Sequence, residues 1–504
     1  MLYLCSVKNK SINNIQESTV MAAKVNNISE LSNFLNDKMR IASTISHLHG
    51  IFRIPQIVHG LRMEKEKGVP CSVLILFLSL FRLCGETVFR GCCSGLMGLL
   101  GGEACCKNCF YRMLNDSTMD WRGFLYAVCK SFLRIADEHG SQAEGKPRCL
   151  IVDDTLLEKT GGHNRMEHVS RVFDHTTHTY VLGFKLQLVV YFDGVTPIPV
   201  DFSIHCEWGR KKDFGLKRKD REARFTKQRA EGSCGRERSE EAVLEKPQVL
   251  VKMLTRLWKR GLRPQYVLYD SWYHSLALVK AVRALGRGAV HVLGMDKNGV
   301  RTYLVKGRKY TTTTMIDSHV ADIRKCDKYR LMYMKVDAMM GDIPVRLFLI
   351  KYGKSSDWKV LVTTDTKMRF TQAFETYQIR WTIEVVFRET KQYLGLGACQ
   401  SLDFDAQIAD ATLVFATYTM MANRKRFGEY ETMGEVFREL REELYALTLW
   451  QRLIPLMANM ICRVAESIEI DVEKVMRAIE NDDKAMEDIV CMAEALKAKD
   501  AINQ

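Results

Sequence analysis

The stretch CLIVDDTLL, residues 149–157, marks a change in the pattern of this chain. It is an apolar run that contains a pair of acidic residues. It is followed by YVLGFKLQLVVYFDG (180–194), in which apolar residues alternate, and then by IPVDFSIH (198–205). Apolar runs and period-two alternation predict three strands. Their close spacing along the chain allows antiparallel pairing.

Downstream of these strands, helical and strand-like patterns alternate. A helix is predicted near 240–260, a strand at YVLYD (266–270), a helix at SLALVKAVRALG (275–286) and a strand at AVHVLGM (289–295). This order predicts an α/β sheet with parallel members. Residues 298–365 return to strand-like alternation, with Gly341-Asp342 as a hairpin signal. The sequence therefore predicts a β-rich insertion after the α/β unit.

The two ends of the chain differ from this central part. Residues 1–145 have mainly helical patterns, and 107–140 predict two helices joined by a polar turn, with Asp116 or Ser117 as the cap of the second. Such a pair is either a DNA-reading unit or only a packing unit. Residues 431–504 are helical and acidic, with 16 Asp/Glu against 9 Lys/Arg. We expect this tail to pack on the rest of the chain or to mediate self-association.

Composition favours a polyanionic partner. The chain has 504 residues, 74 of them basic and 60 acidic, for a net charge of +14. Nucleic acid is the first candidate partner for such a charge. The segment 208–229 carries 10 Lys/Arg against 3 Asp/Glu, which predicts a flexible basic loop that contacts nucleic acid through Lys217, Arg218 and Lys219.

The cysteines and the apolar runs suggest a compartment. There are 16 cysteines and no secretory pattern at the N-terminus, so reduced thiols in a cytoplasmic setting are expected. The longest apolar run, CSVLILFLSLF (71–81), is too short to span a bilayer. The cluster CCKNC (105–109) is either a zinc site of unusual spacing or a set of buried thiols.

Three acidic positions stand out by their context. Asp153, beside Asp154, is expected to end the first strand of the α/β unit, and Asp270 to end the strand YVLYD. Carboxylates at the ends of adjacent strands converge where such sheets bind ligands. Divalent cations would relieve their mutual repulsion, and Mg²⁺ favours oxygen ligands. Two such ions about 3.5–4 Å apart stabilise both oxygens of an in-line phosphoryl displacement.

The third acid, Glu384, lies in YQIRWTIEVVFRETK (377–391). At about 100° per residue, Tyr377, Arg380, Glu384 and Lys391 fall within roughly 60° on one helix face. Arginine grips phosphate with two hydrogen bonds, and lysine supplies a point charge. The alternative is structural: Glu384 would pair with Arg380 and Arg388 along the helix.

This order of motifs resembles the DDE transposases of insertion-sequence family four. The resemblance rests on Asp153 in VDDT, Asp270 in LYDSWY and the Tyr-x2-Arg-x3-Glu-x6-Lys spacing that ends at Lys391, and it covers about residues 145–425. It implies a ribonuclease-H-like catalytic core with a β insertion, and two bound Mg²⁺ or Mn²⁺ ions. It also implies that Asp153, Asp270 and Glu384 bind the metals.

The same resemblance implies roles for the neighbouring residues. Tyr377, Arg380 and Lys391 would hold phosphates at the transposon end. Asp153 is favoured because the family's first acid lies in an Asp-x-Thr pattern, but Asp154 competes, since adjacent strand residues face opposite sides. Some family members have Gly or Ala and an aromatic after the second acid, whereas Ser271 and Trp272 follow here. Trp272 or Trp381 would either stack on an unpaired base or serve as a core or interface aromatic.

The expected architecture is α/β with helical flanks. The expected parts are a helical region at 1–145 as the candidate for binding DNA ends, a first core segment at 146–297, the β-rich insertion at 298–368, the rest of the core at 369–428, and an acidic helical region at 429–504.

The expected function is cleavage at the ends of an insertion sequence and joining of the freed 3′-OH ends to target DNA. The expected partners are double-stranded DNA and a second copy of the chain in a synaptic complex, in a bacterial cytoplasm near the nucleoid and away from membranes. A nuclease without strand transfer and a non-catalytic DNA-binding protein are the alternatives.

Overall fold

The structure is a computed structural model that describes residues 44–445 except 66, 94–105, 141–144, 160–164, 210 and 354–356, together with residues 460 and 464. The chain divides into two compact units. One comprises Met1–Pro55, Glu64–Arg112 and Gly434–Gln504, and the other comprises Gln56–Met63 and Met113–Met433. The two units are described separately below.

The larger unit is built on one mixed sheet, whose strands run in the order β2-β3-β1-β5-β6-β12-β11-β10-β7-β8, with β4 added beside β3 and β9 beside β10. The strands are β1 (Cys149–Glu158), β2 (Ser170–Asp174), β3 (Thr179–Phe192), β4 (Pro197–His205), β5 (Tyr266–Tyr269), β6 (His291–Asp296), β7 (Thr302–Val305), β8 (Arg308–Thr311), β9 (Ile323–Cys326), β10 (Leu331–Met340), β11 (Ile343–Tyr352) and β12 (Trp358–Thr363). β1 pairs with β3 antiparallel and with β5 parallel, and β5 pairs with β6 parallel.

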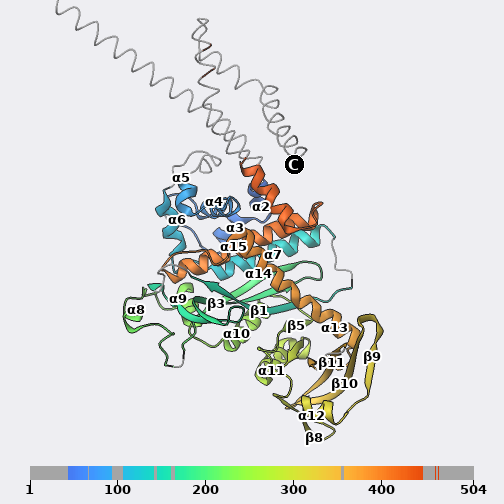
Figure 1. Ribbon diagram of the computed structural model, residues 1–504. Coiled ribbons are helices and arrows are strands. Elements are labelled where there is room, and N and C mark those ends of the chain that lie inside the picture. Colours follow the sequence, from blue (N-terminus) through green and yellow to red (C-terminus); the bar gives the residue numbers. More distant parts are fainter. Residues whose placement is uncertain are drawn as a thin grey trace, which may run out of the picture. The chain divides into compact units, whose positions relative to one another are not determined.

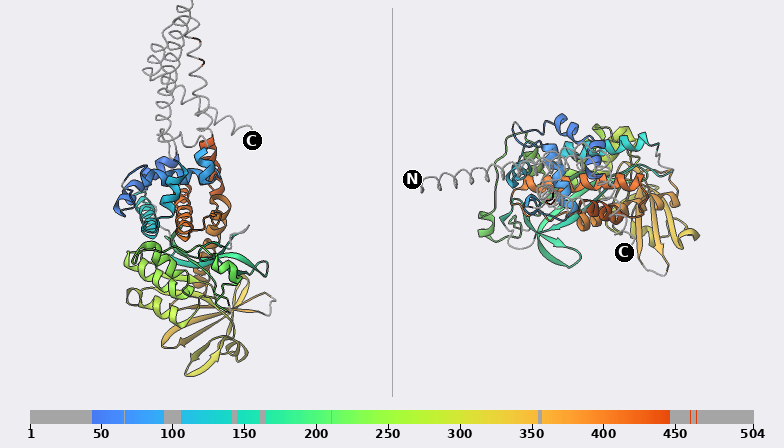
Figure 2. Two further views of the ribbon diagram at one scale, coloured as in Figure 1. Left: turned by 90° about the vertical axis from the view of Figure 1, so that its left-hand side faces the viewer. Right: turned by 90° about the horizontal axis from the view of Figure 1, so that it is seen from above.

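Helices cover both faces of the β1–β3–β5 part of the sheet (Figures 1 and 2). One face carries α7 (Trp121–Glu138), α14 (Thr382–Leu394) and α15 (Phe404–Phe427), and the other carries α10 (Lys246–Lys259) and α11 (Leu276–Ala284). Most residues of α15 from Phe404 to Asn423 are buried on all sides, so α15 is a core helix rather than an amphipathic one. The remaining helices of this unit are α8 (Arg218–Glu222), α9 (Cys234–Glu241), α12 (Thr312–Asp317) and α13 (Phe370–Gln378), with 3-10 turns at Leu285–Gly288, Asp327–Tyr329 and Ile379–Trp381.

The smaller unit is helical where it is described. It contains α2 (Thr44–Ile51), α4 (Cys71–Leu83), α5 (Val88–Cys93), most of α6 (Lys107–Leu114) and a helix over residues 433–445, while α3 (Ile54–Gly60) lies at the border between the units. Phe77, Phe81 and Phe110 pack together, with ring centroids 5.6–6.2 Å apart. The apolar run at 71–81 is therefore a buried helix, as its length predicted. No helix in the described part of the chain is long and apolar enough to cross a membrane.

Most of the predicted strands are confirmed. β1, β3 and β4 match the strands predicted at 149–157, 180–194 and 198–205 to within two residues at each end and pair antiparallel, and β5 and β6 are parallel to β1. β10 and β11 form the hairpin predicted at Gly341-Asp342, where Gly341 has φ +63°. β12 pairs with β6, so the β-rich segment continues the same sheet. The mixed α/β architecture agrees with a ribonuclease-H-like DDE fold.

Several local predictions are wrong. Within the segment 298–365, which was predicted to be strand-like, Thr312–Asp317 form the helix α12, because the Thr311 side chain accepts a hydrogen bond from the Thr314 N–H and caps it. The predicted helix at 240–260 is split into α9 and α10. β2 was not predicted. The stretch 377–391 is not one helix: α13 ends at Gln378, a 3-10 turn follows, and α14 begins at Thr382.

The predicted cap of α7 is also wrong. The cap is Asp120, whose side chain accepts a hydrogen bond from the Gly123 N–H. The carboxylate of Asp116 instead accepts hydrogen bonds from the N–H and hydroxyl of Thr118 within the preceding turn.

Candidate active site

Two of the candidate acids lie at one edge of the sheet. β1 and β5 are parallel neighbours, and Ile151 pairs with Leu268. Asp153 and Asp270 each come two residues after this pair, so the parallel register carries both toward the same edge. The negative charge of Asp270 acts on Asp153, where it helps to raise the pKa of that carboxyl group.

Glu384 is connected to Asp153 through Arg380, which donates a hydrogen bond to each of them. One guanidinium nitrogen of Arg380 donates to Asp153 Oδ2 at 2.8 Å, and the other donates to Glu384 Oε1 at 2.7 Å. Arg380 and Asp153 are 227 residues apart in the sequence. The intrahelical Arg380–Glu384 pair, which was the structural alternative, is therefore present, but the same guanidinium also holds an acid from β1.

Asp153 has an unusual electrostatic environment. Burial raises the pKa of its carboxyl group to about 7, and the neighbouring charges of Asp270 and Asp154 also raise it, while Arg380 opposes them. A buried carboxylate is costly unless a cation compensates it. A cation beside Asp153 therefore strongly favours the ionised form of its carboxyl group.

Asp154 has a different set of partners. Its carboxylate forms an ion pair with Lys246 at the start of α10, and the Lys246 ammonium lies 4.1 Å from the centre of the Trp272 ring. Because successive strand residues face opposite sides, β1 directs Asp153 toward Arg380 and Asp154 toward α10. The sequence analysis missed Lys246, since a lysine at a helix start has no signal that distinguishes it from a solvated one.

Tyr377 and Lys391 lie on either side of the acids. The Tyr377 hydroxyl donates to the backbone carbonyl of Tyr269, at 3.4 Å, next to Asp270. The Lys391 ammonium donates to Thr155 Oγ1 at 2.8 Å and to the Leu156 carbonyl at 2.9 Å. Burial, and then the charge of Lys185, lowers the pKa of Lys391. Both side chains point to strand ends that carry candidate acids.

A groove runs beside this edge of the sheet. It has a volume of about 620 Å³, and its lining includes Lys185 and Lys391 together with Asp174 and His175. Lys185 lies in β3, opposite Leu156 of β1. The sequence analysis did not single out Lys185, because its position beside Lys391 depends on the pairing of β1 with β3.

The donor atoms suit a hard divalent cation, but their present arrangement does not form a complete site. The three candidate acids offer only carboxylate oxygens, the ligand type that Mg²⁺ and Mn²⁺ prefer. Within the described residues, no three His, Cys, Asp or Glu side chains are grouped closely enough to hold a metal ion. The guanidinium of Arg380 lies between Asp153 and Glu384, where it compensates their charge.

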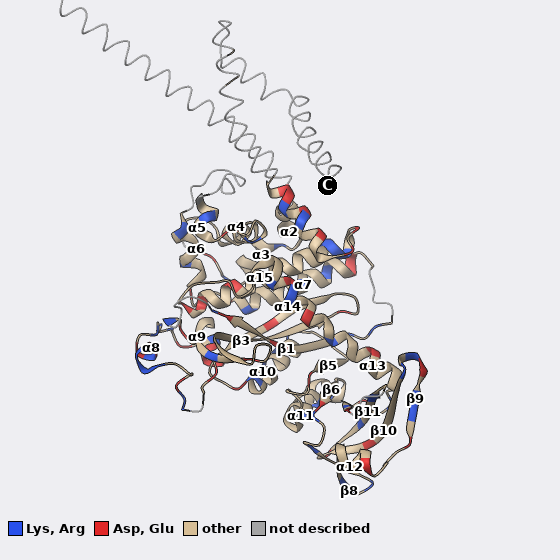
Figure 3. Ribbon diagram, viewed as in Figure 1, with Lys and Arg blue, Asp and Glu red and all other residues tan. Residues whose placement is uncertain are grey.

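The predicted basic loop is a separate feature. Lys217, Arg218 and Lys219 are exposed, and no contact recorded for the described residues joins them to the candidate acids. Figure 3 shows basic residues along α8 and the adjoining loop. Arg218 forms an ion pair with Glu222 within α8, at 2.7 Å.

The end of this loop is anchored, although the sequence predicted a flexible segment. Lys227 forms ion pairs with Asp403 and Asp405, at 2.9 and 2.7 Å. Arg229 contacts Glu167 at 2.6 Å and Asp405 at 3.0 Å. Asp403 caps α15 and Asp405 lies in its first turn, so the basic loop is tied to the core helix of this unit.

Two tryptophans near the acids are exposed. Trp272 is 46% and Trp381 is 62% accessible. A buried core position is therefore wrong for both, whereas the interface and base-stacking alternatives stay predictions. Trp272 lies two residues after Asp270, and its backbone N–H donates to the Asp270 carboxylate, while Trp381 directly follows Arg380, so each tryptophan is a near neighbour of a candidate site residue in the chain.

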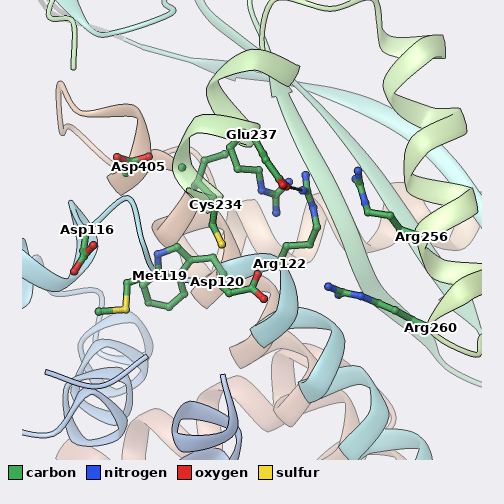
Figure 4. A pocket seen from close by; sticks show the side chains of 13 residues that line it. Asp116, Met119, Asp120, Arg122, Cys234, Glu237, Arg256, Arg260 and Asp405 are labelled. Atoms are coloured by element: carbon green, nitrogen blue, oxygen red, sulfur yellow. Dashed lines mark hydrogen bonds and ion pairs between the residues drawn. The ribbon is translucent and has the colours of Figure 1, made fainter. Parts of the chain in front are cut away.

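A second polar cavity lies elsewhere in the same unit (Figure 4). Its volume is about 240 Å³, and its lining includes Asp120, Arg122, Cys234, Glu237 and Arg260. None of the nine residues predicted for the site lines it. In its wall, Arg122 and Arg256 both bond to Asp201 and Glu241, which makes a buried ion network between α7, α9, α10 and β4. This network supports the core rather than the candidate acids.

Two models of protein families match parts of this chain. A model described as DDE superfamily endonuclease matches residues 105–299, and a model described as Transposase DDE domain matches residues 239–420. No curated protein matches the chain. Asp153 and Asp270 lie in the first matched range, and Asp270 and Glu384 lie in the second. The two overlapping matches support the placement of this chain among the DDE transposases, with a transposase or endonuclease role.

Proposed function

We propose that this chain cuts DNA at the ends of an insertion sequence and joins the freed 3′-OH ends to target DNA, as a member of insertion-sequence family four. Asp153, Asp270 and Glu384 are the catalytic acids of this proposal. The observation that carries it is the contact of a single guanidinium, that of Arg380, with both Asp153 and Glu384, at an edge where Asp270 acts on Asp153.

The proposed cofactors are two Mg²⁺ or Mn²⁺ ions held by these three carboxylates. When bound, such ions supply Lewis acidity that activates water and stabilises a leaving 3′ oxygen. Asp153 is the proposed first acid because it shares Arg380 with Glu384, whereas Asp154 is paired with Lys246. The carboxylates of this chain hold negative charge at one edge of the sheet, and Arg380, in the turn before α14, orients Asp153 and Glu384.

Arg380 has two roles in this proposal. Without DNA its guanidinium compensates Asp153 and Glu384, as the structure shows. A phosphate of the DNA end offers the same fork of hydrogen bonds, because guanidinium binds carboxylate and phosphate in the same geometry. Transfer of Arg380 to the phosphate would free both carboxylates for metal ions and would couple DNA binding to assembly of the site.

The other cations and aromatics extend the contact with DNA. Lys391 borders the groove beside β1, where it would bind a second phosphate, and Tyr377 would hydrogen-bond a phosphate oxygen. Lys217, Arg218 and Lys219 would bind the backbone farther along the duplex. The exposed rings of Trp272 and Trp381 offer stacking surfaces for a base that leaves the duplex.

The proposed roles of the flanking parts follow the same division as the sequence. The helical region 1–145 would bind transposon ends, the β-rich segment 298–368 would insert between the parts of the catalytic core at 146–297 and 369–428, and the acidic region 429–504 would support self-association. A homodimer on DNA would then hold two ends in one synaptic complex. Residues 446–459, 461–463 and 465–504 of the acidic region lie outside the described residues.

A non-catalytic or nuclease-only DNA-binding protein is the second candidate. The observation that favours it is again Arg380, which fills the space between two of the acids. An arginine that stayed there on DNA would leave an incomplete metal site.

An assay with Mg²⁺ and linear DNA that carries the element's own ends distinguishes these functions. The proposal predicts cleavage at the ends, followed by joined products when target DNA is added. Nicks or breaks without joined products would indicate a nuclease. A shifted DNA band without cleavage would indicate a binding protein and would overturn the proposed enzyme.

A further inference from the structure

A pair of cysteines at the start of α6 has a geometry that the proposed DNA chemistry does not use. Cys106 is exposed and lies immediately before α6, and Cys109 lies in the first turn of the helix. Their sulfur atoms are 3.8 Å apart. The backbone N–H of Cys109 donates to the Cys106 carbonyl at 2.9 Å, so a hydrogen-bonded turn holds the two residues together.

The sequence analysis left two possibilities for this cluster: a zinc site or buried thiols. Cys106 is exposed, so burial does not account for it. No group of three metal-ligating side chains occurs among the described residues. The exposure of Cys106 contradicts the buried-thiol explanation for that residue, whereas Cys105 lies outside the described residues and the zinc alternative for the whole cluster stays a prediction.

The position of Cys106 favours the thiolate, which is the reactive form of cysteine. A residue in front of a helix accepts hydrogen bonds from N–H groups of the first turn that have no partner within the helix. The backbone N–H of Asn108 has the largest effect in lowering the pKa of the Cys106 thiol, followed by the Cys109 thiol and the Cys109 N–H. The positive end of the helix acts in the same direction.

Several other thiols of the chain are buried, and their pKa is raised instead of lowered. Burial raises the pKa of Cys84 and Cys206 to about 11. Burial also raises the pKa of Cys129 and Cys149 above its ordinary value. These side chains remain protonated and inaccessible at neutral pH, which makes Cys106 chemically distinct from them.

The distance between the sulfurs is compatible with a covalent bond. A disulfide requires a separation of about 2.05 Å, so the two atoms must approach by less than about 2 Å. Cys106 is exposed, so solvent and a soluble oxidant reach its sulfur. The carbonyl of Cys109 accepts a hydrogen bond from the Lys65 ammonium at 2.9 Å, which fixes the backbone on the helix side of the pair.

We propose that Cys106 and Cys109 form a reversible disulfide within the chain, with Cys106 as the attacking thiolate and a low-molecular-weight disulfide as the oxidant. Cys106 attacks one sulfur of oxidised glutathione, which breaks that S–S bond, forms a mixed disulfide and releases one glutathione thiolate. The Cys109 thiolate then attacks the Cys106 sulfur and releases the second glutathione. The two cysteines lose two electrons and two protons in total, and two glutathione thiols gain them.

This site is independent of the proposed transposase function. It lies in the smaller unit, whereas the candidate acids lie in the larger one. Loss of DNA cleavage therefore does not bear on the disulfide, and absence of the disulfide does not bear on the acids.

Redox titration of the full chain tests the proposal. The reduced protein is equilibrated with glutathione buffers of increasing oxidised fraction, free thiols are blocked, and peptides are identified by mass spectrometry. The expected product is a peptide that links Cys106 to Cys109 and lacks two hydrogens, and the reduced form should return with excess reduced glutathione. A wild-type chain that carries a stoichiometric zinc ion and resists thiol blocking at these positions would overturn the proposal, as would a bridge from Cys106 to any other cysteine.

Two single-cysteine variants separate the roles of the thiols. Cys109→Ser should trap a stable mixed disulfide with glutathione at Cys106, because the resolving thiol is absent. Cys106→Ser should give neither the bridge nor a mixed disulfide in this segment. Cys234→Ser, in the larger unit, is the control and should leave the Cys106–Cys109 bridge unchanged. Failure of Cys109→Ser to trap glutathione at Cys106 would contradict the assignment of the attacking sulfur.

Discussion

At the scale of single residues, Arg380 is the centre of the candidate site. Its guanidinium carries one positive charge and contacts two carboxylates that are proposed to bind metal ions. A guanidinium and a divalent cation cannot occupy the space between Asp153 and Glu384 together, because both need the same oxygen atoms. The two cations should therefore compete, and a DNA phosphate should favour the metal by drawing Arg380 away.

Removal of this guanidinium should strengthen metal binding in the absence of DNA. We expect Arg380→Ala to bind Mn²⁺ about tenfold more tightly than the unaltered chain, a coupling of ordinary size between competing ligands. Calorimetry or electron paramagnetic resonance of the DNA-free protein measures this affinity. Arg388→Ala, which removes an exposed arginine from the same helix, should have no effect. Equal Mn²⁺ affinity in all three proteins would contradict the competition.

Glu384 should be required for chemistry but not for DNA binding. Glu384→Gln keeps the size of the side chain and removes its charge, so a metal ion would lose a ligand while the basic surfaces stay intact. We expect a loss of cleavage of more than about 100-fold, the upper end of what loss of a supporting contact costs at metal sites. Cleavage and bandshift assays on the same DNA measure the two effects. Undiminished cleavage would remove Glu384 from the mechanism.

At the scale of elements, anchoring gives the basic loop a defined position. Lys227 and Arg229 hold the end of the loop against the first turn of α15, and α8 presents exposed cations. The loop therefore loses less conformational freedom when it meets DNA than a disordered segment would.

Neutralisation of the loop should flatten the salt dependence of DNA binding. Each phosphate contact contributes about −0.9 to the slope of log affinity against log salt concentration, so replacing Lys217, Arg218 and Lys219 by Gln should reduce the slope by up to about 2.7. Bandshift titrations from low to high salt measure it. The control variant replaces the exposed Lys306, Arg308 and Lys309 by Gln, which removes the same number of positive charges from a different segment of the chain. An equal change in both variants would indicate a net-charge effect and not a loop contact.

The N-terminus of α7 gives a second test at this scale. Asp120 caps the helix, whereas the sequence favoured Asp116 or Ser117. Asp120→Ala should lower the free energy of unfolding by about 1 kcal/mol, the usual cost of losing a helix cap. Asp116→Ala should cost less, since it removes hydrogen bonds only within the exposed turn at Thr118. Urea unfolding of the two variants decides between them, and an equal loss would count against Asp120 as the cap.

At the scale of the whole molecule, buried histidines make stability depend on pH. Burial lowers the pKa of His168, His205 and His274 to about 4, from an ordinary value near 6.5. Between these values the unfolded chain binds more protons than the folded one. Stability is therefore fully present above about pH 6.5 and falls as the pH drops toward 4.

Between these two pKa values, each of these histidines should lower the free energy of unfolding by about 1.4 kcal/mol for every pH unit of acidification. Urea unfolding at pH 7, 6 and 5 measures the slope for the full chain. His168→Gln should reduce the slope by about that amount, whatever its effect on stability at pH 7. A slope that stays the same in His168→Gln would show that this side chain does not titrate on unfolding.

The sequence determined the elements of the sheet and the order of its motifs. Strand periodicity at 149–205 and the alternation that follows are local signals, so they predicted β1, β3, β4, β5 and β6 without any knowledge of contacts. The spacing from Tyr377 to Lys391 is equally local, and it indicated the family that the two domain matches support. Turn and cap details were less predictable, because Thr311, Asp116 and Asp120 each have several hydrogen-bonding options of similar energy.

Only the tertiary structure decided how these parts meet. It paired Asp153 with Arg380 and Asp154 with Lys246, exposed Trp272 and Trp381, and tied the basic loop to α15. Each of these contacts joins residues that are far apart in the chain or depends on which face of a strand a neighbour covers. Local periodicity determines which residues share a face, but packing between distant segments determines what that face contacts.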